Sequence, residues 1–186
     1  MRVDKSFCTL KKVLHELDNL ALTGANIIPI MSETAYNTDT RFGTSEYFAE
    51  TLKSKCGNDI IKTVKEAEPI GPKKLLDLLI IAPCTGNTLA KIANGIADSS
   101  VTMAVKAHLR NQKPVLIAVS TNDGLATAAQ NIGKLLNYRN MYFVPFGQDD
   151  YVKKPNSLVA DMTQILPSAM LALEGEQIQP LLLCSK

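Results

Sequence analysis

Two short runs of small polar residues follow apolar stretches of this sequence. Residues 85–88 (TGNT) come soon after the apolar run at 75–83, and residues 120–123 (STND) follow the apolar run at 113–119. The hydroxyl and amide groups of both runs can hydrogen-bond a polar ligand, and Gly86 lets the backbone approach such a ligand closely. Spacing alone supports a second interpretation equally well, because Thr85 or Asn87 could simply cap the helix that follows.

The elements around these runs alternate between strands and helices. Four apolar runs predict strands, at 25–31, 75–83, 113–120 and 140–146. Apolar residues at helical spacing predict helices at 11–24, 45–57, 86–98, 100–111, 124–138 and 157–175. The strands are apolar without alternation, as in parallel sheets that are covered on both faces. We therefore predict one α/β domain of three layers over residues 1–186, with an extended C-terminal arm from about residue 174.

This architecture predicts where the two polar runs lie. Ligands of open α/β sheets bind outside the carboxyl ends of the strands, so residues 85–88 and 120–123 should share one site at that edge. Such sheets normally begin with a strand, but the first predicted element is a helix that starts near Phe7. Either the chain lacks this strand or the strand precedes residue 1. In the second case Ser6 stands at a helix N-terminus that could bind an anion.

Composition excludes several classes of function. The net charge of +2, with Lys and Arg scattered among Asp and Glu, does not favour a nucleic-acid partner. No apolar run reaches the roughly 18 residues of a membrane span. Four cysteines lie far apart without metal-ligand spacing, so we predict no metal site and no disulfide framework. These features predict a cytoplasmic protein without a membrane partner.

The segment "IAPCTGNTLAKIANGIADS" (81–99) resembles the signature of the flavin-binding cysteine-decarboxylase superfamily. Three further stretches, "AYNTDTRFG" (35–43), "AEPIGPKK" (67–74) and "MYFVPFGQDDYVKKPNSLVA" (141–160), are similar to one family within it, the dipicolinate synthase B subunits. The resemblance implies a flavodoxin-like (Rossmann-like) fold. It also implies oxidation of dihydrodipicolinate to dipicolinate during sporulation, in the cytoplasm of the mother cell, together with an A subunit that carries NAD(P).

The resemblance also implies a set of site residues. It maps flavin-contacting positions onto Ser6, Ser32, Thr85, Asn87, Thr88 and Ser120, with Gly86 among them as the point of close approach. Such a set of donors suits FMN, whose phosphate favours helix N-termini and hydroxyl groups, and it equally suits a dicarboxylate. The superfamily forms trimers, which implies a homo-oligomer that is a trimer or a multiple of one. Small residues on the predicted helices 87–98 and 100–111 could supply its contact.

Two departures from the superfamily bear on the reaction. Decarboxylating members carry a His on the first helix and a Pro-x-Met-Asn motif after a later strand. Here His15 lies about two turns into the first helix, and "VSTNDG" (119–124) lacks that Met. The alternatives to an oxidoreductase subunit are a non-catalytic stabilising subunit and an FMN-dependent decarboxylase. No GxGxxG turn occurs in the 186 residues, so a nicotinamide acceptor is expected on the partner.

Several other side chains have both a functional and a structural interpretation. Asp123 and Asn122 are the candidates for catalysis, and Arg41 could clamp a substrate carboxylate or be a solvated loop residue. His15 is expected on the surface.

For three further positions the structural interpretation is favoured. His108 is expected to be structural, as a cation near a helix C-terminus. Cys84 is expected to be a small, partly buried hydrophobe because no neighbouring His or Asp could activate it. Lys153 and Lys154 are expected in a solvated loop that could become ordered when a ligand or a partner binds.

Overall fold

The computed structural model describes residues 5–39 and 43–184, with side chains from Lys12 onward. Its first half contains α1 (Lys5–Leu22), α2 (Glu33–Asn37), α3 (Ser45–Cys56), α4 (Val64–Ala67), the 3-10 helix η1 (Glu68–Ile70), β1 (Leu79–Cys84) and α5 (Gly86–Ala93). Its second half contains α6 (Ser100–Leu109), β2 (Val115–Thr121), α7 (Thr127–Leu136), β3 (Met141–Phe143), β4 (Phe146–Asp150), β5 (Lys154–Ala160), η2 (Met162–Gln164) and α8 (Ile165–Glu174).

The sheet is organised around β2. This strand pairs in parallel with β1 on one side and with β3 on the other, and its first five residues are buried. At its carboxyl end β2 pairs antiparallel with β5, which forms a hairpin with β4. A strand that is apolar on both faces is stable only where helices cover both faces, which explains its unbroken run of Val, Leu, Ile and Ala.

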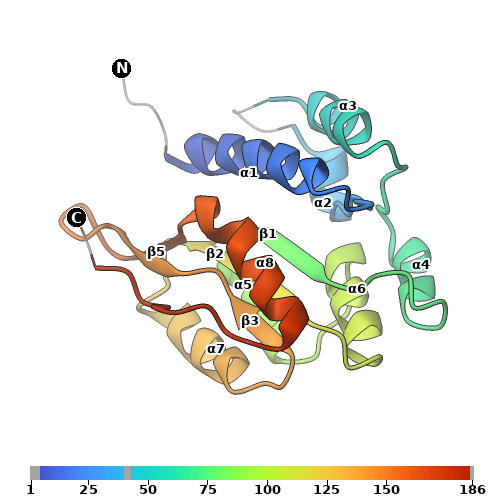
Figure 1. Cartoon of the computed structure of the whole chain (residues 1–186). Coiled ribbons are helices and arrows are strands. Elements are labelled where there is room, and N and C mark those ends of the chain that lie inside the picture. The colour runs from blue at the N-terminus through green and yellow to red at the C-terminus, as the bar shows by residue number, and fades with distance from the viewer. Residues whose placement is uncertain (1–4, 40–42, 185–186) are drawn as a thin grey trace.

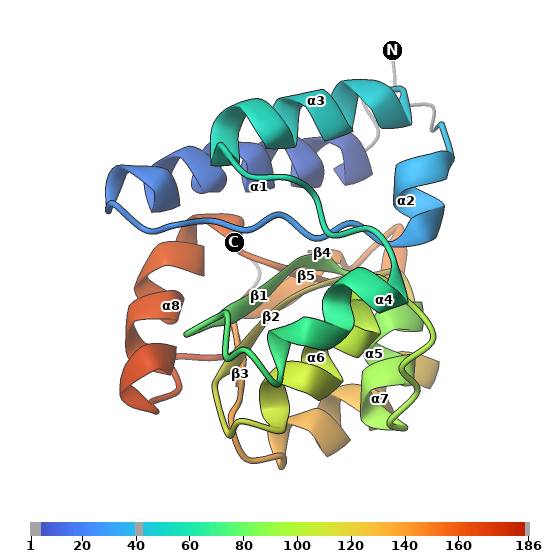
Figure 2. The same cartoon turned by 90° about the vertical axis from the view of Figure 1, so that its right-hand side faces the viewer.

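Helices cover both faces of the sheet, so the fold has three layers (Figures 1 and 2). α1 and α8 lie on one face, where α1 contacts β1 and α8 contacts β2 and β3. α5, α6 and α7 lie on the other face. α3 packs on the outer side of α1 (Figure 2), and it contains no buried residue. The predicted α/β, flavodoxin-like class is therefore confirmed, with an antiparallel hairpin added to the parallel strands.

The prediction of one helix over 157–175 is wrong in its first half. Residues up to Ala160 belong to β5, and α8 begins only at Ile165 after η2. The cause is local, because the Asp161 side chain accepts a hydrogen bond from the Thr163 N–H (3.2 Å) and so starts the helical segment after the strand. The apolar spacing did not distinguish the strand from the helix that follows it.

Other boundaries also differ from those predicted. Residues 25–31 form no named strand, since their only bridge is between Ile30 and Ile61. The helix predicted at 86–98 ends at Ala93, and Gly95 adopts a left-handed φ of 70° that stops it. The helix predicted from residue 124 starts at Thr127. There the Asp123 carbonyl accepts bonds from the N–H groups of residues 126 and 128, which form a turn first.

The arm after α8 packs along the sheet. The Gln177 side chain makes two hydrogen bonds with the backbone of Phe143, accepting from its N–H (2.8 Å) and donating to its carbonyl (2.7 Å). Farther along, the Leu183 N–H donates to the Phe146 carbonyl at 2.9 Å. The arm therefore adds backbone pairing to β4. Within the described ranges, no helix combines the length and hydrophobicity that a membrane span requires.

Candidate functional site

The two polar runs meet at the carboxyl ends of β1 and β2. A Cβ atom built on Gly86 would lie 2.7 Å from Thr121 Oγ1 and 2.8 Å from Asp123 Oδ1. Such distances mean that the first residue of α5 touches the loop after β2. The parallel register, which pairs Cys84 with Val119, brings the two strand ends level. The sequence-based expectation that these runs lie side by side is therefore what the structure shows.

The loop after β2 is held by its own hydrogen bonds. The Thr121 hydroxyl donates to Asp123 Oδ1, and the Asp123 carbonyl accepts from the N–H groups of Ala126 (2.9 Å) and Ala128 (3.1 Å). Asp123 is partly buried, and Asn122 beside it is exposed. These bonds fix the carboxylate of Asp123 and leave the Asn122 side chain accessible to a ligand.

The start of α5 combines capping with exposed donors. Thr85 is the N-cap, and its Oγ1 accepts from the Thr88 N–H at 3.5 Å and lies 3.2 Å from the Thr88 hydroxyl. The capping interpretation is thus correct for Thr85. Asn87 is exposed on the same turn, so its amide is accessible to a bound molecule. Ser120 is partly buried and pairs through its backbone with Val159 of β5.

Among the described residues, no hydrogen bond joins the other predicted site residues to these loops. Ser32 caps the short helix α2 by accepting from the Ala35 N–H (3.2 Å). Its neighbours Met31 and Glu33 bond instead to Ser100, the first residue of α6. Arg41 lies outside the described residues.

Ser6 is the first of the predicted flavin-contacting residues along the chain. It lies in the first turn of α1, and its side chain is outside the described part. The described contacts therefore unite residues 85–88 with 120–123 only. Thr121 belongs to the predicted run at 120–123 but was given no role of its own, and its hydrogen bond to Asp123 was not foreseen.

Burial decides the role of Cys84. Its side chain is fully buried at the end of β1, and this burial strongly raises the pKa of its thiol. A thiol in such surroundings stays protonated and is a poor nucleophile. Cys84 is accordingly a small core residue, more deeply buried than the sequence suggested.

Two histidines, His15 and His108, have opposite environments. The His15 side chain is 75% exposed on α1, as expected. His108 is 1% exposed near the end of α6, and its Nε2–H donates to the Pro114 carbonyl at 3.0 Å. Burial lowers the pKa of His108, so the ring is neutral at pH 7. The structural role is correct, but the expected cation at the helix end is wrong because the ring has no access to solvent.

We predict that His108 makes the protein less stable in mild acid. Its pKa in the folded state lies below the unfolded value of about 6.5, so the unfolded chain binds the proton first. The free energy of unfolding should fall as the pH drops from 7.5 through 6.5 toward the folded pKa, by about 1.4 kcal/mol per unit of pKa difference. Urea unfolding at pH 7.5 and 5.5 measures this. His108→Gln, which keeps an N–H donor, should reduce the pH dependence, and His15→Gln should not; equal pH dependence in all three proteins would contradict the prediction.

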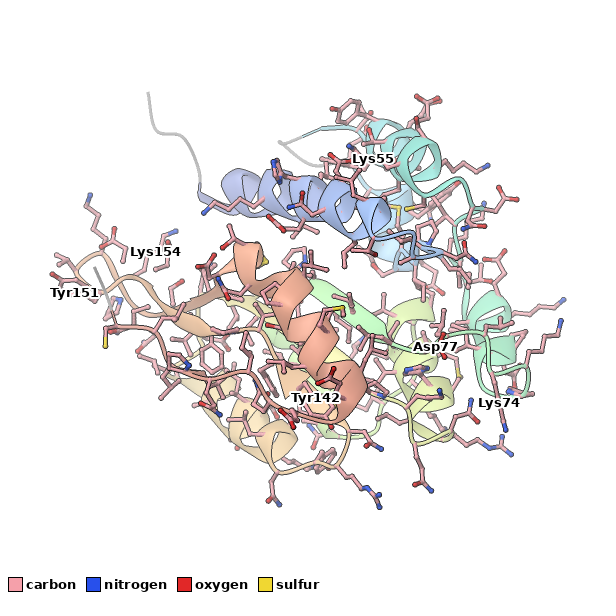
Figure 3. The ribbon with its side chains drawn as sticks, in the orientation of Figure 1. Lys55, Lys74, Asp77, Tyr142, Tyr151 and Lys154 are labelled. Carbon is pink, nitrogen blue, oxygen red and sulfur yellow. The ribbon has the colours of Figure 1, made fainter. Side chains whose placement is uncertain are left out.

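The β4–β5 hairpin extends past the carboxyl end of β2. Lys154 is the first residue of β5 and therefore lies in a strand. The loop predicted around residues 153–154 is limited to the turn before it. Tyr151 (59% exposed) and Val152 (74% exposed) occupy that turn, and Figure 3 shows Tyr151 and Lys154 at the outer end of the hairpin. The Lys153 N–H donates to Asp150 Oδ1 at 3.0 Å, which holds the turn.

A hollow of about 410 Å³ lies at the opposite end of the sheet. Its lining includes Pro114 and Asn140, which precede β2 and β3, together with Asp77, Tyr142 and Glu174. Figure 3 shows Asp77 and Tyr142 far from the hairpin. The hollow is open and mixes charges of both signs at the amino ends of the strands. It is therefore separate from the site formed by the polar loops.

The sequence matches the model of one protein family, described as Flavoprotein, over residues 5–168. The chain belongs to the flavoprotein family. It is 41% identical over 177 residues to the B subunit of dipicolinate synthase from Bacillus subtilis, covering 95% of this chain and 88% of that protein.

Two solved structures of flavoprotein-like folds resemble this one. The crystal structure of the dipicolinate synthase B subunit from Bacillus halodurans superposes with a TM-score of 0.88 at 43% identity, covering 97% of this chain and 92% of that chain. The FMN-dependent cysteine decarboxylase SpaF superposes with a TM-score of 0.51 at 17% identity, covering 80% of this chain and 98% of that chain. The second likeness shows the shared fold alone.

Proposed function

We propose that this flavoprotein is the B subunit of a dipicolinate synthase and that it takes part, with an A subunit, in oxidising dihydrodipicolinate to dipicolinate. The observation that carries the proposal is 41% identity across 95% of the chain to a protein of that name. The site at the ends of β1 and β2 supports it, because exposed and partly buried donors there face one edge of the sheet. By the same similarity, the protein would act in the mother-cell cytoplasm of a sporulating bacterium.

The proposed cofactor is a flavin, with FMN as the first candidate. The family description points to a flavin, and a protein that shares the fold is named as FMN-dependent. The chemistry of the loops fits, because hydroxyl and amide groups of residues 85–88 and 120–123 can bond the polar edge of a flavin ring. A bound flavin would supply a hydride acceptor. An absorbance spectrum of the purified protein between about 350 and 500 nm tests for it, since flavins absorb in that range.

The oxidation removes a hydride and a proton from a dihydropyridine ring that carries two carboxylates. Its driving force is aromatisation, so the protein needs to hold the ring near the acceptor and to balance two negative charges. In our proposal Asn87 and Asn122 hydrogen-bond the ring ligand, Asp123 accepts the proton and Arg41 pairs with a carboxylate. NAD(P) would be carried by the A subunit.

Asn87→Ala should weaken the binding of FMN or of dipicolinate. The exposed amide of Asn87 would leave a ligand group without its hydrogen bond, which costs about 1–3 kcal/mol. Isothermal titration of both ligands measures the change. Asn137→Ala, an exposed Asn at the far end of α7, is the matched control and should bind as the wild type does. Unchanged affinity of Asn87→Ala for both ligands would remove Asn87 from the site.

We also propose that the chain forms a trimer or a multiple of one. Part of the predicted contact is used inside the protomer, because Ala93, Ala104 and Ala107 are buried there. The surface that is left for a contact between subunits includes Gly95 and Ile96, which lie just after α5. Ile96 is 47% exposed. Light scattering at micromolar concentration measures the mass, and a single 20.2 kDa species would contradict the proposal.

A further inference from the structure

A carboxylate lies against the first residue of α5. Asp123 Oδ1 is 2.8 Å from the position that a Cβ of Gly86 would occupy, and Gly86 is the first residue of that helix. Asp123 comes from the loop after the neighbouring strand, so the contact joins the two halves of the proposed site. The free N–H groups at the start of a helix carry partial positive charge, and a nearby carboxylate complements that charge.

Thr121 holds this carboxylate in place. Its hydroxyl donates to Asp123 Oδ1, the same oxygen that faces Gly86, and Oγ1 itself is 2.7 Å from the Gly86 Cβ position. Asp123 Oδ1 thus accepts the Thr121 hydroxyl and lies against Gly86. A carboxylate has two oxygens with about four lone-pair sites, so Asp123 keeps acceptor capacity for a ligand.

The fixed negative charge decides which part of a ligand can bind at this point. A phosphate or carboxylate group would be repelled by Asp123 and would compete with it for the positive end of α5. An uncharged ring edge with an N–H group would instead gain a hydrogen bond to a charged acceptor, which is stronger than a bond between neutral groups. The flavin ring carries such an N–H.

We infer that Asp123, positioned by Thr121, is a specificity-determining residue that accepts an uncharged, N–H-bearing ring edge at the start of α5 and excludes phosphate and carboxylate groups from it. The inference rests on the proposed function for the identity of the ring ligand. It also requires the negative groups of FMN or of the substrate to lie away from residues 85–88.

Binding measurements with charged and uncharged probes test the inference. The probes are riboflavin, which has the flavin ring without phosphate, inorganic phosphate, and pyridine-2,6-dicarboxylate. Asp123→Asn should bind riboflavin about tenfold more weakly and both anions about tenfold more tightly than the wild type, because the charge is removed while the shape is kept. The control Asp77→Asn makes the same charge change at a side chain that is 88% exposed near the opposite end of the sheet, and it should change none of the three affinities.

A second pair of variants tests the positioning role of Thr121. Thr121→Val removes the hydroxyl and should weaken riboflavin binding several-fold, whereas Thr121→Ser keeps the donor and should restore it. Equal melting temperatures of the two variants would show that the difference comes from the hydrogen bond and not from folding. Equal riboflavin affinity in Thr121→Val and Thr121→Ser would overturn the positioning role.

The anion measurements separate this inference from the proposed function. If the wild type binds no riboflavin, the flavin part of the proposed function fails, and the two anions still decide the role of Asp123. Tighter anion binding by Asp123→Asn than by the wild type supports the inference. Equal binding of both anions by the two proteins, including no binding by either, overturns it.

Discussion

The isolated chain should oxidise dihydrodipicolinate at a rate close to background, and activity should appear when the A subunit is added. No GxGxxG turn occurs in the 186 residues, so the nicotinamide that would complete the reaction is expected on the A subunit. Neither histidine can serve in the loops at the strand ends, since His108 is buried near the end of α6 and His15 is exposed on α1. In our proposal, proton transfer there depends on Asp123 and on groups from the partner. Following the absorbance of the product with each protein alone and with both together measures this division of labour.

Hydride transfer to a flavin on this chain would give a different experimental result. Anaerobic mixing of the isolated chain with substrate would bleach a bound flavin if this chain accepts the hydride itself. Bleaching at a rate comparable to turnover of the two-subunit complex would contradict our expectation and leave the A subunit with only the task of regenerating the flavin. The A subunit measured alone is the control, because activity without this chain would remove its catalytic role.

The closeness of the two polar runs could be predicted because it follows from local rules. Pro83 and the run at 85–88 follow an apolar strand, the run at 120–123 follows the next, and parallel strands bring their carboxyl ends to one edge. The Gly86 contact with Thr121 and Asp123 agrees with that reasoning. The spacing of the polar residues in the sequence did not show that the two loops touch. The distance between the loops depends on the register in which β1 and β2 pair.

The features that were missed depend on tertiary packing and strand pairing. The β4–β5 hairpin is stabilised by antiparallel pairing with the end of β2, which the apolar spacing of 157–175 does not reveal. The charge state of His108 could not be predicted either. Its position near a helix end indicated a cation, whereas the ring is buried and bonded to Pro114, six residues away. Burial of a polar side chain is set by tertiary packing and not by its place in a helix.

Gly86→Ala should disrupt the proposed site. Gly86 does not have a left-handed φ, so Ala would suit its backbone and the effect would be purely steric. The new methyl group would lie 2.7 Å from Thr121 Oγ1 and 2.8 Å from Asp123 Oδ1, closer than van der Waals contact allows. Because these oxygens are hydrogen-bonded to each other, the loop after β2 must move as a unit. We expect a loss of about 1–3 kcal/mol in the free energy of unfolding.

The same change should weaken the binding of FMN or dipicolinate by about tenfold or more, because the ligand would meet a displaced loop. Gly133→Ala is the matched control. Gly133 lies inside α7 with nothing within 4 Å of its Cβ position, so Ala should raise the stability by up to about 1 kcal/mol and leave binding unchanged. Urea unfolding and ligand titration of both variants make the comparison. If Gly86→Ala were as stable as Gly133→Ala and bound ligand normally, the two loops could not be in the close contact on which the site depends.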